Sequence, residues 1–110
     1  MSKVGLDDET LRDAVAKMEA GLIDADLGGG LVKKRVALPR KGERGGARTI
    51  VATNHCGIWF FLFGYQKNER ANISMQDAEV LKLLGTKLLR MDDIMLVAAI
   101  STGQIREVTL

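Results

Sequence analysis

The chain has very few of the residues on which the commonest metal and nucleophile sites are built. Its 110 residues include one cysteine, one histidine and one proline. A single cysteine excludes an internal disulfide framework and fits a reducing compartment. His55 and Cys56 together are too few ligands for a zinc site, and any Ser/His/Asp triad would have to use His55. We therefore expect neither a metal nor a cofactor.

Long apolar runs are also missing. The longest is Ile58–Phe63, far short of the roughly 20 residues that span a bilayer, and the first residues are too polar for a signal peptide. Hydrophobic residues make up 46% and charged residues 27%, which excludes a disordered or fibrous class. We expect one cytoplasmic domain over residues 1–110, with no membrane contact.

Positive and negative charges are distributed unevenly along the chain. The net charge is +2, yet residues 31–48 carry seven basic groups against Glu43, a net of +6, while residues 1–26 carry three basic and seven acidic groups, a net of −4. Such segregation produces a local positive field and indicates contact with a polyanion such as nucleic acid. A solvated loop is the alternative reading, and charge alone leaves both open.

Helical spacing of apolar residues predicts two long helices and a shorter one. The first runs from Asp8 to Glu19 with Asp7 or Asp8 as its cap. The second runs from Met75 to Arg90, where Ser74 begins a capping-box pattern. Asp92 or Asp93 is expected to cap a shorter helix that continues through Ile100 and ends at Gly103. In the first helix the apolar residues at helical spacing are Leu11, Ala14, Val15, Met18 and Leu22. In the second, the stripe expected to be buried is Val80, Leu81, Leu84, Leu88 and Met91.

Between the first two helices the pattern changes to that of strands. Leu31–Leu38 and Arg48–Thr53 are predicted as the first two, and Ile58–Tyr65 is so apolar that we expect it at the centre of the sheet. Gly28-Gly29-Gly30 is read as a flexible connection from helix to strand, and Gln104–Val108 as a short last strand. The fold class expected is α+β, a small antiparallel sheet with helices packed on one face.

The chemistry that such a chain can support rests on arginine and lysine. RNA cleavage by the RNA's own 2′-hydroxyl needs alignment, positive charge on the phosphorane and help in moving protons. His55 is the one side chain that titrates near neutral pH without perturbation. Tyr65 ends the third strand beside the basic cluster, and it is the aromatic residue most suited to stack on a base.

Two stretches carry a resemblance to a known family. Gly45–Ile50 contains GGART and Phe63–Arg70 reads FGYQKNER, and Gly21–Arg35 also looks like the same family. The chain resembles the RelE-like toxins of type II toxin–antitoxin systems, in particular the HigB-like branch. The match covers roughly residues 10–92.

The resemblance implies a ribosome-dependent mRNA endonuclease, or mRNA interferase, that inhibits translation. It implies 2′-hydroxyl attack without a metal, and a cognate helix-turn-helix antitoxin encoded in the same operon. The residues expected to act in catalysis are Arg48, Lys67, Arg70 and His55. Those expected to bind RNA are Lys33, Lys34, Arg35, Arg40, Lys41, Arg44 and Tyr65.

Two positions differ from the best-studied RelE-type enzymes. Asn68 and Ser74 stand where those enzymes have an active-site arginine and a tyrosine. This difference motivates a second hypothesis, a non-catalytic binding module that is either a degenerate toxin or an inhibitor of a protein target such as gyrase. A third possibility is a structural partner without activity of its own.

Overall fold

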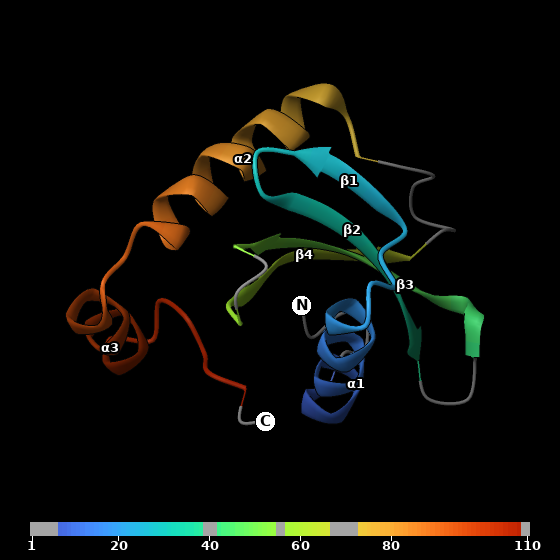
Figure 1. Cartoon of the computed structure of the whole chain (residues 1–110), viewed down its shortest axis with the longest axis horizontal. Helices are drawn as coiled ribbons and strands as arrows, with labels where there is room; N and C mark the ends of the chain where they lie inside the picture. Colours follow the sequence, from blue (N-terminus) through green and yellow to red (C-terminus); the bar gives the residue numbers. More distant parts are fainter. Residues whose placement is uncertain (1–6, 39–41, 55–56, 67–72, 109–110) are drawn as a thin grey trace.

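The chain folds into an antiparallel sheet with helices before and after it (Figure 1). The computed structural model describes residues 7–38, 42–54, 57–66 and 73–108. The elements in this part of the chain are α1 (Asp8–Glu19), β1 (Ala25–Gly28), β2 (Leu31–Leu38), β3 (Gly42–Thr53), β4 (Trp59–Gln66), α2 (Met75–Leu89) and α3 (Asp93–Ser101). The predicted α+β class is confirmed.

Side-chain caps define where the three helices begin. The carboxylate of Asp7 accepts a hydrogen bond from the Thr10 backbone N–H at 2.8 Å, and the Ser74 hydroxyl accepts one from the Asp77 N–H at 3.0 Å. Asp92 caps α3 in the same way. These bonds satisfy N–H groups that have no partner within the helix, so short polar residues determine the first turn. All three helices begin where the sequence pattern predicts.

The sheet has the order β1-β2-β3-β4, with each strand antiparallel to the next. The prediction that Ile58–Tyr65 is central is wrong, because β4 is an edge strand. Its apolar character has another cause: Trp59 and Phe61 contact one hydrophobic cluster, while Phe60 and Phe63 contact another. Both faces of this edge strand are therefore covered.

The triple glycine is a hairpin turn rather than a loose connection. Gly28 pairs with Leu31, so Gly29 and Gly30 form a two-residue loop between β1 and β2. Their φ angles are +62° and +80°. Two consecutive positive φ values match the twist of antiparallel strands, and glycine adopts them without steric cost. The sequence reading missed β1 because it treated this turn only as a break.

Helices α1 and α2 pack against opposite faces of the sheet, which differs from the expected packing on one face. Side chains alternate between faces along each strand. Val32 and Val51 pack with Ala14, Val15 and Met18 of α1. The neighbouring strand residues on the other face belong to a second cluster that includes α2, with Leu31, Ile50, Ala52, Leu81 and Leu89 among its members. The sheet is thus a middle layer. The expectation that Val80 and Leu84 belong to a buried stripe is wrong, because the buried residues of α2 are Gly85 and Leu88, and the side chains of Val80 and Leu84 are exposed.

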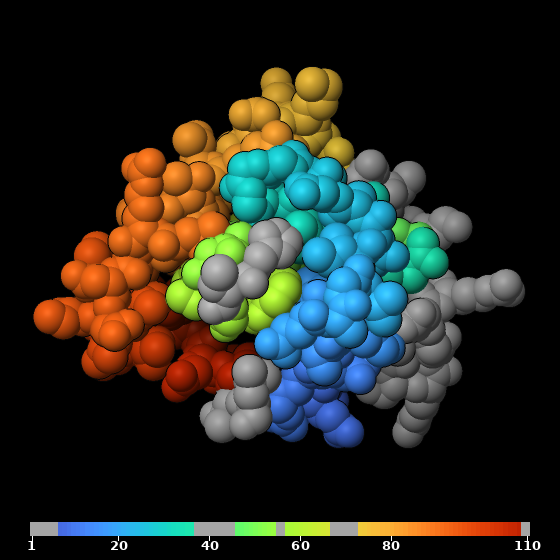
Figure 2. All heavy atoms as spheres, in the orientation of Figure 1, coloured from blue at the N-terminus to red at the C-terminus, as the bar shows by residue number. Residues whose placement is uncertain are grey.

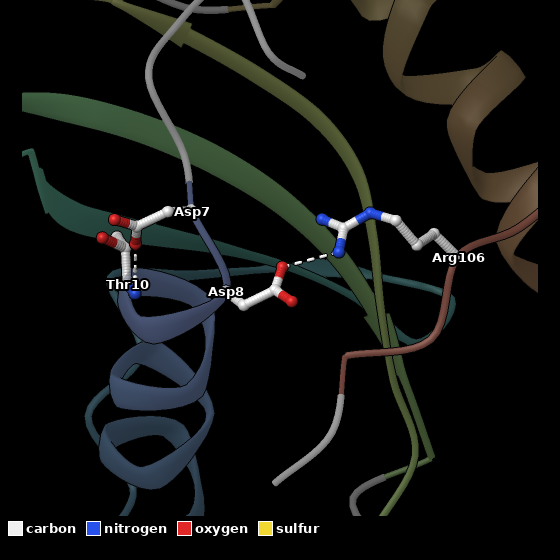
Figure 3. Close-up of polar contacts among 4 residues, drawn as sticks. All are labelled: Asp7, Asp8, Thr10 and Arg106. Carbon is white, nitrogen blue, oxygen red and sulfur yellow. Dashed lines mark hydrogen bonds and ion pairs between the residues drawn. The ribbon is translucent and has the colours of Figure 1, made fainter.

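The segment after α3 returns to α1 without forming a strand. The expected strand at Gln104–Val108 is wrong, since the structure shows no strand over these residues. Arg106 instead pairs with Asp8 at 2.6 Å (Figure 3). Both side chains are exposed, and exposed ion pairs contribute little to stability. No helix in the described part of the chain has the length and apolarity to cross a membrane.

The Asp7 cap predicts an acid-sensitive contribution to stability. Hydrogen bonds from the Thr10 side chain and backbone lower the pKa of Asp7 below its ordinary value (Figure 3). A lowered folded-state pKa stabilises the protein above the unfolded-state pKa, and this is lost as the pH falls through the folded-state value. Asp7→Asn keeps a hydrogen-bond acceptor but does not titrate. We therefore expect the wild type to have the higher thermal midpoint at neutral pH, and the difference between the two midpoints to become smaller below about pH 4. A difference that stays constant from pH 7 to pH 3 would contradict this.

Candidate nucleic-acid interface

Two arginines lie directly opposite each other on neighbouring strands. Arg35 of β2 pairs with Arg48 of β3, and Arg48 pairs in turn with Tyr65 of β4. Residues paired in register project to the same face of a sheet. Lys33 lies two residues before Arg35, so it shares that face. Three of the predicted site residues, Lys33, Arg35 and Arg48, are thereby brought together.

The electrostatics of this pair are unfavourable for folding alone. Like charges directly opposite each other on adjacent strands are destabilising. Within the described residues, neither Arg35 nor Arg48 has a carboxylate in ion-pair contact. The Asp24 carboxylate accepts a hydrogen bond from the Arg35 backbone N–H. Two arginines paired across the strands, with no ion-pair partner among the described residues, form an arrangement that favours binding of an external anion.

The two arginines differ in their exposure to solvent. Arg35 is exposed, whereas Arg48 is half-buried between β2 and β4. Beneath this position lies the apolar cluster that contains Ile50 and Tyr65. A charged group on a rigid, partly desolvated strand is better positioned to stabilise a developing charge than a mobile surface group. Arg48 is therefore the better candidate to stabilise a developing charge, and Arg35 the better candidate for a solvent-exposed contact.

Tyr65 supports this surface from the core, and its ring is not exposed for stacking on a base. Only 1% of its surface is exposed, and its ring centroid is 5.9 Å from that of Phe63. The expectation that its ring is open to a base is wrong, because the ring is buried in the apolar cluster that contains Leu31 and Ile50. Its ring fills the core on the same face as Arg48.

Lys34 lies on the other face of β2. It is buried, with 6% of its surface exposed, on the face that α1 covers. Its backbone carbonyl accepts a hydrogen bond from the Thr49 hydroxyl at 2.8 Å. Alternation along the strand places it away from Arg35. Lys34 is therefore not brought together with the other basic residues.

The remaining candidates lie outside the described residues. These are His55, Lys67, Arg70, Arg40 and Lys41, together with the side chain of Arg44. Lys67 follows Gln66 directly in the chain, and Gln66 pairs with Ala47, the residue before Arg48. Among the residues that are described, no group of three His, Cys, Asp or Glu side chains is arranged to hold a metal ion.

The fold is thus a small α+β domain with three basic side chains, Lys33, Arg35 and Arg48, on one face of its sheet. A family model described as the RelE toxin of the RelE / RelB toxin–antitoxin system matches residues 1–108. The chain therefore belongs to the RelE toxin family, and it is the toxin of a toxin–antitoxin pair, with an antitoxin as its partner. No curated protein and no solved structure is significantly similar to it.

The predicted resemblance to RelE-like toxins is thus confirmed over nearly the whole chain. Its assignment to the HigB-like branch stays a prediction. Sequence reasoning found Arg35 and Arg48 separately but did not pair them, since pairing depends on strand register. The signal that could have helped is the hairpin between Leu31 and Thr53, whose two apolar strands allow few registers that keep both faces buried.

Proposed function

We propose that this toxin is an mRNA endonuclease that cuts messages on the ribosome in the cytoplasm and so inhibits translation. The observation that carries the proposal is the Arg35–Arg48 pair, two opposed cations without an internal counter-charge in the described chain. An RNA backbone supplies the anion that such a pair lacks. The resemblance to HigB-like toxins supports the ribosome as the place of cleavage.

The proposed reaction uses the 2′-hydroxyl of the RNA as the nucleophile. The 2′-oxygen forms a bond to phosphorus while the bond from phosphorus to the 5′-oxygen breaks. One proton leaves the 2′-hydroxyl and one is delivered to the departing 5′-oxygen, so the products are a 2′,3′-cyclic phosphate and a 5′-hydroxyl. The nucleophile is part of the substrate, so the protein contributes alignment, charge and proton transfer. No metal is required in this scheme.

Six of the predicted site residues have a role in this proposal. Arg48 is aimed at the two negative charges that develop on the phosphorane, and Arg35 and Lys33 hold the adjacent backbone. Lys67 and Arg70 are proposed to complete the phosphate site, and His55 to donate the proton to the leaving oxygen. Lys34 is left out of the proposed RNA surface because it lies on the α1 face.

Induction of the wild-type protein in the absence of its antitoxin tests the proposal. We expect growth arrest accompanied by new mRNA 5′ ends that carry a hydroxyl and fall within codons being translated. Mapping of 5′ ends by sequencing, with and without an inhibitor that keeps ribosomes off the message, measures both points. For variants of the site arginines, the charge-matched control is Arg12→Ala, which removes an arginine of α1 outside the proposed site and is expected to behave as the wild type.

The outcomes of this experiment separate the two hypotheses. Arrest with intact messages would overturn the nuclease proposal and favour the non-catalytic module that acts on a protein target such as gyrase. Cleavage that persists when ribosomes are kept off the message would retain the nuclease and remove its dependence on the ribosome. Inspection of the adjacent gene for a small helix-turn-helix protein tests the expected form of the antitoxin.

A further inference from the structure

Most of the exposed large apolar side chains in the described part of the chain lie on α2 and α3. Nine large apolar side chains are exposed there and elsewhere, and eight of these nine belong to the two helices. Leu83 is 73% exposed and Ile94 is 81% exposed. Figure 2 shows the two helices adjoining along one side of the molecule. Apolar side chains gathered in this way mark a surface that another molecule covers.

Helix α3 is apolar on every side. Its sequence, DIMLVAAIS, contains one charged residue, Asp93, at its first position. A helix without a polar face is normally buried all round. Only Ala99 is buried here, and α3 stands apart from the sheet in Figure 1. The outward positions Ile94, Val97 and Ala98 carry no charge.

Helix α2 has a second stripe opposite the one that contacts the sheet. Gly85 and Leu88 are buried on the sheet side. The outward stripe contains Gln76, Val80, Leu83, Lys87 and Arg90, at alternating spacings of four and three residues. This spacing is that of a seam between two helices that pack side by side. Val80 and Leu83 lie at its centre, with 63% and 73% of their surfaces exposed.

Charges along α2 are arranged so that the helix complements a copy of itself. Acidic residues lie in its first half, at Asp77 and Glu79, Lys82 lies at its middle, and basic residues follow at Lys87 in the last turn and Arg90 at the C-cap. When two copies pack antiparallel about Leu83, residue 79 of each copy lies opposite residue 87 of the other. Glu79 forms an exposed pair with Lys82 at 3.6 Å, and its side chain remains 73% exposed. Both ends of the contact then join opposite charges.

We propose that the outer surface of α2 and α3 is a two-fold contact between two copies of this chain. A two-fold contact requires a patch that is complementary to itself, and α2 has this property in both its apolar centre and its charged ends. α2 packs on Leu31, Ile50 and Ala52, on the same sheet face as Arg35 and Arg48, and its outward stripe lies on the side of the helix away from the sheet. The inference is independent of the proposed nuclease activity.

Sedimentation velocity of the purified full-length chain, at increasing micromolar concentrations, tests the proposal. We expect a dimer for the wild type. Leu83→Glu is expected to give a monomer, because it places two carboxylates face to face on the two-fold axis. Leu83 is exposed within the chain, so an unchanged thermal midpoint will show that the fold is intact.

A charge swap tests the antiparallel arrangement itself. We expect Glu79→Lys and Lys87→Glu each to raise the dimer dissociation constant about tenfold, because each replaces two attractive pairs by two repulsive ones. The double variant should restore the wild-type value, and Arg12→Glu on α1 should leave it unchanged. A monomeric wild type, or a double variant no better than the singles, would overturn the proposal, and binding of the antitoxin to this surface of a monomer would identify a different occupant.

Discussion

Replacement of Arg48 by alanine is expected to reduce RNA cleavage by roughly 10²–10³-fold. Arg48 is the half-buried member of the opposed arginine pair and lies between two neighbouring strands. Its loss removes the positioned positive charge that stabilises the phosphorane. Solvated cations elsewhere on the surface can bind RNA but do not replace that stabilisation. Single-turnover cleavage of a message on programmed ribosomes measures the rate. Arg48→Lys should retain part of it, because the charge remains but the two-pronged geometry is lost.

The stability of the Arg48→Ala variant distinguishes a functional role of Arg48 from a structural one. Arg48→Ala removes a like-charge contact with Arg35, so the thermal midpoint should stay the same or rise while the rate falls. Arg35→Ala should instead weaken RNA binding and reduce its dependence on salt by about one unit of slope, with a small effect on the single-turnover rate. Equal losses of rate in both variants, or a lower midpoint for Arg48→Ala, would contradict the assigned roles.

Replacement of Gly85 by alanine is expected to destabilise the protein, although alanine is the better helix former. A Cβ at Gly85 would lie 2.9 Å from the Cβ of Ala52, which is fixed to the backbone of β3. Overpacking of this kind costs about 1–3 kcal/mol and outweighs a helix-propensity gain of about 1 kcal/mol. We expect the thermal midpoint to fall by several degrees, as measured by circular dichroism.

Two variants make this test specific to the contact between α2 and the sheet. Thr86→Ala, at the next and exposed position of α2, should leave stability unchanged or raise it slightly. Ala52→Gly removes the opposing methyl group, so the double variant with Gly85→Ala should lose less stability than the two single changes added together. A Gly85→Ala protein as stable as the Thr86→Ala protein would show that the helix is not held this close to β3.

The helices were predictable from the sequence because their signals are local. Asp7, Ser74 and Asp92 each bond to an N–H three residues later, so a single short polar residue determines each start. The apolar spacing of α1 also predicted its buried residues, apart from Leu22, which is 57% exposed because the helix has already ended at Glu19. A periodic pattern continues in the sequence beyond the point where the backbone leaves the helix.

The strands were less predictable because their neighbours are distant in the chain. The apolar run in β4 indicated cover on both faces but could not distinguish a central strand from an edge strand between two hydrophobic clusters. The length of β3, which begins at Gly42 and not at Arg48, depends on its pairing with β2. Burial of Tyr65 likewise depends on the cluster formed with Leu31 and Ile50.

By itself the sequence determined the α+β class, the caps of the three helices, the segregation of positive charge and the family. These properties depend on residue type and on spacings within a few positions. Only the tertiary structure decided that Arg35 and Arg48 lie opposite each other, that Lys34 belongs to the other face, and that α2 has both an inner and an outer apolar side. Strand register and layer packing join residues that are far apart in sequence, and a one-residue change of register would move each of these side chains to the other face.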